Sequence, residues 1–358
     1  PGAGPGDWVS GVLATDPGGG HRLLETVVHA ACVSGAPDVT LAARLDALAF
    51  RAELVAAARV WFRDRGFLEV ETPCRVRNPG LEPHLRAFPA DRDGRRWLAT
   101  SPELHMKRLL AAGAERIVEF ARAFRDDERG PWHQPEFTML EWYRAWEGLD
   151  ALERDCESMI AALAGVSGAA RDLPVPFRRT TVRAEIAGRT GIDLRLAAGR
   201  DDLAREVERR GHRVAPDDDR DAIFFRLWIT EVEPHLGRDR PVFVHGYPAS
   251  QAALARTGED DGFAVAERFE LYVDGIEVAN AFHELNDPDE QRRRHERDRA
   301  DREADGAPVH DLDEPFLDAL AAGMPPASGI ALGLDRLIAL LGGFDGIAAV
   351  TAFPDPER

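Results

Sequence analysis

Apolar side chains recur every three or four residues between Leu41 and Phe62, which is the spacing of an amphipathic helix. Thr40 is suited to cap the start of this helix, and Gly66 marks its end. The next segment, FLEVETP at 67–73, predicts a short strand that the proline stops. This order of elements makes the segment a candidate for the edge of a dimer.

Helical and strand patterns alternate in the rest of the chain. Ser101 and Pro102 are suited to open a helix as its N-cap and first residue, and Asp217-Asp218-Asp219 predicts a solvated turn. The other predicted elements are helices at 150–165, 201–211 and 288–304, strands at 117–124, 136–142, 269–273 and 276–281, and a strand or turn leading into a helix at 328–341. Strand pairs with short loops, and helices grouped elsewhere, indicate an α+β fold with an antiparallel sheet.

Residues 1–40 differ from the rest because they are rich in glycine and proline. Two candidate strands, at 8–13 and 21–34, are suited to form a hairpin around the glycines. The stretch is too short for a five-stranded barrel. We therefore predict an N-terminal appendage at 1–40 and one larger domain at 41–358.

Charge and composition exclude several classes of protein. The 358 residues include 63 acidic residues against 45 Lys and Arg, a formal net charge of −18, which argues against tRNA as a partner. No apolar run approaches ~18 residues, and no secretory-signal pattern is present, so we expect no membrane association. Cys32, Cys74 and Cys156 form no CxxC pair, which favours reduced thiols and a cytoplasmic location.

Two segments have residues that bind a chain of phosphates. Arg125 stands at the end of a predicted strand and is followed by three acidic residues. Arg336 follows Gly333 at the predicted start of a helix, where a glycine allows a ligand to approach the backbone. Arginine binds phosphates bidentately, and nearby carboxylates can hold Mg²⁺. Read singly, each arginine is more often a surface ion-pair residue, and no Walker A pattern is present.

The segment from Glu277 to Glu284 supplies two carboxylates. Along a regular strand Glu277 shares a face with Ala279 and Ala281, so Glu277 and Glu284 share a face only if a bulge or turn intervenes. Together with Asn280 they could bind a metal or a substrate ammonium, although exposed strand carboxylates remain the alternative. Lys107 is the one lysine of the chain, which reflects either a bias towards arginine codons or a need for a compact ammonium.

Three segments resemble the three motifs of class II aminoacyl-tRNA synthetases, namely FLEVETP at 67–73, FRDDERGPWHQPEF at 124–137 and GIALGLDR at 329–336. The stretches TSPELHMKRLL, PEFTMLEWY and ERFELYVDGIEVANAFHELND are similar to those of the lysyl-tRNA synthetase group. The resemblance covers about residues 42–353. It implies the class II catalytic fold, an antiparallel sheet flanked by helices, and a homodimer formed through the first motif.

This resemblance also implies ATP and Mg²⁺ as cofactors, with Arg125 and Arg336 on the phosphates and Phe137 against the adenine. The implied catalytic residues are Arg125, Arg336, Glu277 and Glu284, and the implied metal ligands are Glu277 and Glu284. The implied ATP site comprises Arg125, Asp126, Asp127, His133, Gln134, Phe137, Glu277, Val278, Gly333 and Arg336. The implied amino-acid site comprises Ser101, Pro102, Glu103, Tyr143, Asn280, Glu284 and Ala331.

Within this group the chain most resembles the stand-alone paralogues that attach β-lysine to elongation factor P. The segment YPASQAAL at 247–254 is similar to theirs, the stretch before the first motif has no room for a tRNA-reading barrel, and Ala331 stands where lysyl-tRNA synthetases carry glycine. The resemblance implies activation of lysine or β-lysine as an adenylate and transfer to a lysine side chain of elongation factor P. One methyl group shifts discrimination by about 1–3 kcal/mol, so we expect Ala331 to disfavour α-lysine.

Some positions depart from the pattern of the group. Asp127 replaces a glutamate, Gln134 an asparagine, and Ala281 a glycine. A truncated lysyl-tRNA synthetase or another amino-acid-activating paralogue is therefore an alternative. A non-catalytic binder of an amino acid or nucleotide is a second alternative.

Overall fold

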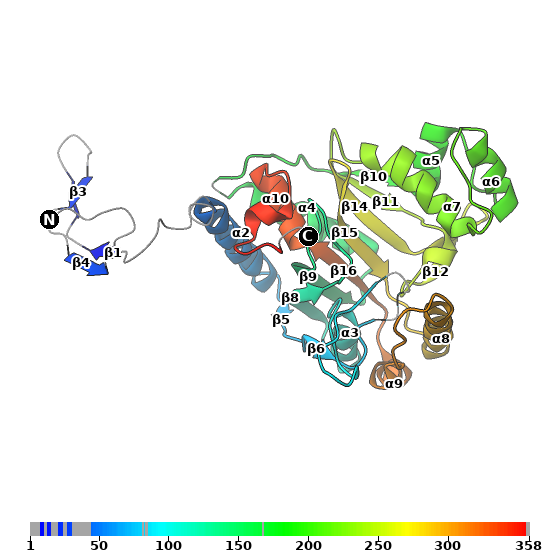
Figure 1. Cartoon of the computed structure of the whole chain (residues 1–358), viewed down its shortest axis with the longest axis horizontal. Helices are drawn as coiled ribbons and strands as arrows, with labels where there is room; N and C mark the ends of the chain where they lie inside the picture. Colours follow the sequence, from blue (N-terminus) through cyan, green and yellow to red (C-terminus); the bar gives the residue numbers. More distant parts are fainter. Residues whose placement is uncertain are drawn as a thin grey trace. The chain divides into compact units, whose positions relative to one another are not determined.

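The computed structural model describes residues 44–80, 82, 85–166 and 168–355, and before them four short strands. The chain forms two units, Pro1–Ala49 and Phe50–Arg358. In the first unit (Figure 1) the antiparallel pairs are β1 (Trp8–Ser10) with β4 (Val27–Ala30) and β2 (Leu13–Thr15) with β3 (His21–Leu23). Thr40 and the division predicted after it lie outside the described residues, and the division stays a prediction.

An eight-stranded sheet forms the framework of the second unit. From one edge to the other its strands are β10 (Arg178–Thr181), β11 (Val242–His245), β14 (Arg268–Val273), β15 (Ile276–His283), β16 (Ala327–Gly333), β9 (Glu136–Ala145), β8 (Arg116–Phe124) and β5 (Leu68–Glu69). Inner neighbours are antiparallel, whereas β10 and β5 run parallel to β11 and β8. The predicted antiparallel sheet is confirmed, and parallel pairs occur only at its two edges.

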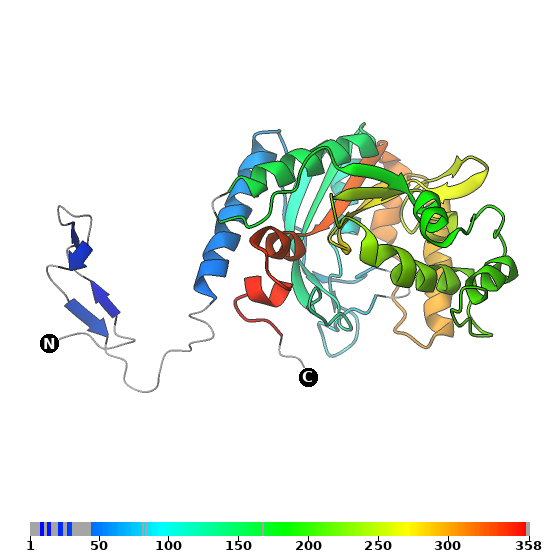
Figure 2. The same cartoon turned by 90° about the horizontal axis from the view of Figure 1, so that it is seen from above.

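One face of the sheet carries the largest apolar core. It is covered by α4 (Leu149–Ala164), α10 (Leu334–Gly342) and α2 (Leu45–Arg63) from residue 50 onward, as Figures 1 and 2 show. The strands alternate accordingly, so that Phe269, Leu271 and Val273 of β14 enter this core while Arg268 and Glu270 do not. Burying each large apolar side chain stabilises the fold by ~1.5–3 kcal/mol.

The opposite face of the sheet carries polar side chains such as Arg268 and Glu270. It is flanked by α3 (Glu103–Ala111), α8 (Pro288–Ala304) and α9 (Glu314–Gly323). Leu104 and Leu110 of α3 pack with Phe316 of α9 and with Tyr143 of β9. These contacts fix the start of α3 over the middle of the sheet, where the candidate site lies.

A second helical cluster packs on the β10–β11 edge. It consists of α5 (Val182–Thr190), α6 (Arg200–Glu208), α7 (Arg220–Leu227), a π-helical turn (Trp228–Val232) and a 3-10 turn (Glu233–His235). The remaining elements are β6 (Arg75–Val76), β7 (Trp97–Leu98), β12 (Thr257–Asp260), β13 (Phe263–Ala266) and 3-10 turns at Ala249–Gln251 and Ile347–Val350. Among the described residues, no helix combines the length and apolarity needed to cross a bilayer.

The structure differs from the sequence pattern in several elements. The predicted strand at 67–73 is ordered as a strand only at Leu68–Glu69. The predicted solvated turn is confirmed at Asp217, which is exposed in a turn, and it leads directly into α7, because Asp219 Oδ1 accepts a hydrogen bond from the Ala222 amide at 2.7 Å. Next to it, Asp218 pairs with Arg226 at 2.6 Å.

Candidate active site

A bulge in β15 decides where its carboxylates point. Opposite β14, Leu271 pairs with Ala279 while the next residue, Tyr272, pairs with Glu277. Val278 is therefore the extra residue of the bulge. Ala279 and Ala281 enter the apolar core, whereas Glu277 lies within reach of Arg336, 3.9 Å from its Nη1. The expectation that Glu277 shares a face with these alanines is wrong, because the bulge reverses the alternation.

Arg336 joins three predicted ATP-site segments. Its Nη1 donates to the carbonyl oxygen of Glu277 at 2.9 Å, and its Nη2 lies 2.7 Å from His133 Nε2. Its Nε donates to the carbonyl oxygen of Trp132 at 3.0 Å. Burial and the Arg336 charge lower the pKa of His133, so the neutral imidazole accepts from the guanidinium. A Cβ at Gly333 would lie 3.2 Å from Arg336 Cδ, so this glycine leaves room for the arginine.

Arg125 occupies the start of the loop between β8 and β9. Its Nη1 lies 3.1 Å from Glu128 Oε1, and its guanidinium lies 5.3 Å from the ring centre of Phe137. The loop is tied to a neighbouring segment, because Asp127 pairs with Arg86 at 3.0 Å and the Asp126 amide donates to the Arg86 carbonyl.

Gln134 has a structural contact of its own. Its Oε1 accepts a hydrogen bond from the Asp355 amide at 2.7 Å, and the side chain is buried. The glutamine thus links the C-terminal segment around Asp355 to the loop between β8 and β9.

Two further charged residues of β14 were missed by the sequence analysis. Arg268 pairs with Glu270, whose carboxylate also accepts a hydrogen bond from Tyr272 at 2.6 Å. Burial first, and then the Glu270 charge, raises the pKa of Glu277. The signal was present, because Arg268 and Glu270 alternate with apolar residues on the strand.

The predicted amino-acid residues meet at the start of α3. Lys107 Nζ lies 2.6 Å from Glu103 Oε1 and 2.5 Å from Glu284 Oε2, and the lysine is fully buried. Burial lowers the pKa of Lys107, but the charges of Glu103 and Glu284 outweigh this effect and raise it. The lysine therefore stays protonated between its two carboxylates.

Glu141 is another residue that the sequence analysis missed. It accepts hydrogen bonds from Tyr143 at 2.6 Å and from Ser101 at 3.0 Å, and it is 1% exposed. Burial and then repulsion by Glu103 raise its pKa. Ser101 also accepts from the Glu103 amide at 3.0 Å, so it caps the first turn of α3 although Pro102 is the residue at the boundary. Among the residues that the structure describes, the pocket therefore holds three carboxylates and a single ammonium.

Asn280 and Ala331 connect the two groups of residues. In the sheet, Asn280 lies opposite Glu270 of β14 on one side and opposite Ala331 of β16 on the other. Ala331 in turn lies opposite Glu141 of β9. The Asn280 Oδ1 is buried and has no partner among the described residues. These two positions lie between the residues around Arg336 and the carboxylates around Lys107.

The two predicted metal ligands have different surroundings. Glu277 lies with Arg336 and Glu270, whereas Glu284 lies with Lys107 and Glu103. Among the described residues, no group of three His, Cys, Asp or Glu side chains has the arrangement of a metal site. The side-chain contacts therefore assign Glu277 and Glu284 to separate parts of the site.

An antiparallel sheet that carries arginines beside one group of carboxylates, and a separate acidic pocket on the same strand, defines a class II synthetase type of catalytic domain. The family model of class II tRNA synthetases (D, K and N) matches residues 38–357, and the chain belongs to this family. Within it the chain is similar to the elongation factor P–(R)-β-lysine ligase of Yersinia enterocolitica, with 42% identity over 314 residues, 85% of this chain and 93% of that protein. The protein of the same name from Salmonella paratyphi B is 41% identical over 311 residues, with the same coverage.

Proposed function

We propose that the protein is a ligase that uses ATP to activate lysine or β-lysine as an adenylate and then transfers it to a lysine side chain of elongation factor P. The observation that carries this proposal is the acidic pocket of Glu103, Glu141 and Glu284, in which Lys107 is the single cation among the described residues. A substrate with an ammonium group balances this charge. The relatives that share 41–42% of their residues with the chain support the identity of substrate and acceptor.

The residues divide into two functional groups. Ser101, Glu103, Glu141, Tyr143, Asn280 and Glu284 would hold the amino acid by its ammonium groups. Arg125 and Arg336 would hold the phosphates, and Phe137 and His133 would lie beside the adenine. Arginines placed where charge develops lower the barrier mainly by electrostatic stabilisation.

The proposed reaction has two steps. A carboxylate oxygen of the amino acid attacks the α-phosphorus of ATP, and the bond to the bridging oxygen breaks so that pyrophosphate leaves with the electron pair. The acceptor amine then attacks the carbonyl carbon, AMP leaves, and the amine loses a proton. Binding both reactants in one orientation supplies much of the rate.

We propose that Mg²⁺ binds at the carboxylates near Arg336. Glu270 is buried, whereas the Glu277 side chain is 39% exposed. Partial burial first, and then the Glu270 charge, raises the pKa of Glu277, and a divalent cation relieves such repulsion. Glu284, the second predicted ligand, pairs with Lys107, and Glu270 likewise pairs with Arg268, so we propose Glu277 as the ligand from this cluster, and Glu284 stays a prediction. When bound, Mg²⁺ neutralises phosphate charge.

We further propose a homodimer formed through α2 and β5. Leu68 of the edge strand β5 is 61% exposed and Val60 of α2 is 44% exposed. An edge strand beside exposed apolar side chains is a surface suited to pairing with a second copy. The predicted cytoplasmic location stays a prediction, and the net charge of −18 still argues against tRNA as the acceptor.

The proposal is tested by amino-acid-dependent ATP–pyrophosphate exchange with α-lysine, β-lysine and ornithine. We expect exchange with lysine or β-lysine, and a fall of ~10²–10³ in kcat for Arg336→Lys. Arg299→Lys, an exposed arginine of α8, is the matched control. Exchange with none of the three amino acids would support a non-catalytic binder. Charging of lysine tRNA in place of elongation factor P would identify a truncated synthetase.

A further inference from the structure

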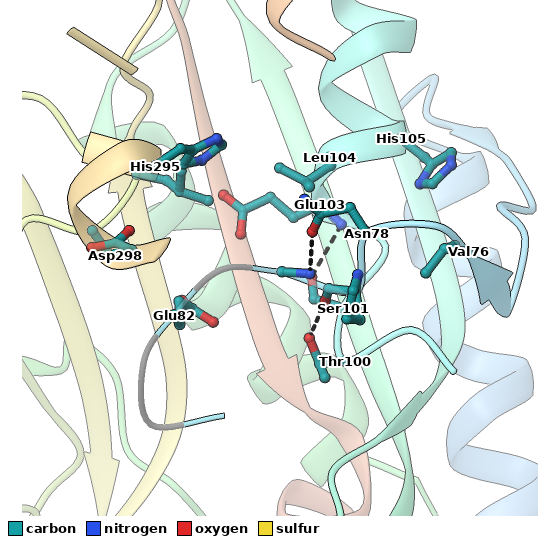
Figure 3. A pocket seen from close by; sticks show the side chains of 14 residues that line it. Val76, Asn78, Glu82, Thr100, Ser101, Glu103, Leu104, His105, His295 and Asp298 are labelled. Atoms are coloured by element: carbon teal, nitrogen blue, oxygen red, sulfur yellow. Dashed lines mark hydrogen bonds between the residues drawn. The ribbon is translucent and has the colours of Figure 1, made fainter. Parts of the chain in front are cut away.

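A cavity of about 40 Å³ lies beside the amino-acid pocket and continues beyond it. Ser101 and Glu103 form one side, and His295 and Asp298 of α8 form another, as Figure 3 shows. On this measure a cavity needs ~10–15 Å³ to hold one water molecule, so there is room for a small polar group.

The cavity is acidic. Its lining includes the carboxylates of Glu82, Glu103 and Asp298, which come from three separate segments. Burial first and then the Glu103 charge raise the pKa of Glu82, and burial with the Glu82 charge raises the pKa of Asp298 to about 6. The carboxylates therefore repel one another across a common space, which disfavours an anion there.

His295 supplies an acceptor at the same place. It is 3% exposed, and its Nδ1 has no hydrogen-bond partner among the described residues. Burial, with the charge of Lys107 next, lowers the pKa of His295 to about 4, so the imidazole is neutral. In Figure 3 the Glu103 carboxylate points to the side of the cavity that carries His295. A buried ring nitrogen without a partner indicates that a hydrogen-bonding group belongs beside it, and in the tautomer without a proton on Nδ1 the imidazole accepts from a donor.

The cations nearby are engaged elsewhere. Lys107 lies between Glu103 and Glu284, and Arg302 Nη1 donates to the carbonyl oxygens of Glu82 and Leu85 at 2.7 and 3.0 Å. Arg294 Nη1 likewise donates to the carbonyls of Ala253 and Ala255. Among the described residues, no side chain forms an ion pair with Glu82 or Asp298. In the described part of the chain, the cavity carboxylates other than Glu103 thus have no paired cation.

We propose that this cavity binds the ammonium group of a primary amine, which donates to the carboxylates of Asp298 and Glu82 and to the imidazole of His295, beside the carboxylate of Glu103. An ammonium has three donors, no acceptor and nearly the volume of a water molecule, so it matches the lining in charge, hydrogen bonding and size. The inference rests on the proposed function in one respect, because Ser101 and Glu103 also belong to the amino-acid pocket. The amine is then either an amino group of the activated amino acid or the side chain of the acceptor lysine.

Binding is tested first without catalysis, by isothermal titration of the full chain with n-butylammonium chloride. The variants are Asp298→Asn, which removes one charge at constant shape, and His295→Phe, which removes the acceptor and retains the ring. Glu303→Gln, an exposed glutamate on the same helix, is the control. We expect the Kd for n-butylammonium to rise at least tenfold in both variants and to stay unchanged in the control.

Two kinetic measurements on the same variants distinguish the source of the amine. A tenfold rise in the KM for the amino acid in pyrophosphate exchange, at unchanged kcat, assigns the cavity to the activated amino acid. Unchanged exchange with slower consumption of preformed adenylate by elongation factor P assigns it to the acceptor lysine.

Several results would overturn the inference. These are no binding of n-butylammonium to the wild-type protein, equal binding to wild type and both variants, or unchanged kinetics in both measurements. Amine binding by a wild-type protein that exchanges with no amino acid would contradict the proposed function and leave the cavity assignment standing.

Discussion

Lys107 Nζ lies 2.5 Å from Glu284 Oε2, and both side chains are shielded from solvent. This contact joins α3 to the end of β15. It explains why the single lysine of the chain lies here, because a compact ammonium reaches two carboxylates at once where the larger guanidinium of arginine would not fit.

Replacement of Lys107 by methionine should destabilise the protein by ~3–5 kcal/mol, because Glu284 would remain buried without a cation. The free energy of unfolding in urea measures this effect. Arg108→Met, at an exposed position of the same helix, is the control and should change stability little. A loss below about 1 kcal/mol for Lys107→Met would show that the pair contributes little.

Two glycine-to-alanine changes should have opposite effects. At Gly329 the new methyl group would overlap the Tyr143 ring and the Glu284 carboxylate, so we expect a loss of ~1–3 kcal/mol and a higher KM for the amino acid. At Gly188, inside α5, the methyl group meets no atom within 4 Å, so we expect a gain of ~0.5–1 kcal/mol. Melting temperatures of both variants test the pair, and a stabilised Gly329→Ala would contradict the described packing.

Ala331→Gly tests the proposed discrimination between substrates. Ala331 lies between Asn280 and Glu141 in the sheet, so its methyl group is placed at the middle of the candidate site. Removing it should shift the ratio of kcat/KM for α-lysine and β-lysine towards α-lysine by ~10-fold or more. Adenylation assays with both isomers give this ratio, and an unchanged ratio would end the hypothesis.

Glu233 should make stability depend on pH. Burial first, then the charges of Glu277 and Glu270, raises its pKa from 4.5 to about 7. The unfolded chain therefore loses this proton before the folded chain does, so the contribution to stability falls as pH rises from about 4.5 to 7.

Glu233→Gln removes that ionisation. The melting temperature of the variant should equal that of the wild type near pH 4.5 and exceed it at pH 8, measured without nucleotide. Glu208→Gln, at an exposed position of α6, should show no such trend. A difference that is the same at both pH values would argue against a buried, repelled carboxylate at Glu233.

Leu68→Asp tests the proposed dimer. A charge on the edge strand β5 should separate the two copies, which sedimentation equilibrium or light scattering measures directly. Leu196→Asp changes a residue that is 82% exposed on another part of the surface and should leave the mass unchanged. A monomeric wild-type protein, or a dimeric Leu68→Asp variant, would disprove this interface.

Much of the architecture follows from local sequence patterns. The helix at 288–304 and the strands around Asp274-Gly275 were predicted within two residues of their observed bounds, because apolar periodicity and turn residues act between near neighbours. The class II family followed from three motifs whose residues are contiguous in the chain. Segments such as α5 and α7, with weaker periodicity, were not predicted.

Only the tertiary structure decided how the charged residues are grouped. The extra residue Val278 in β15 turned Glu277 towards Arg336, and strand register placed Glu141 beside Ser101. Contacts of this kind depend on the alignment of segments that are distant in the chain, and a shift of one residue reverses every side chain of a strand. The sequence by itself determined which elements and which family to expect, whereas packing across the sheet determined which carboxylates lie near Arg336 and which lie around Lys107.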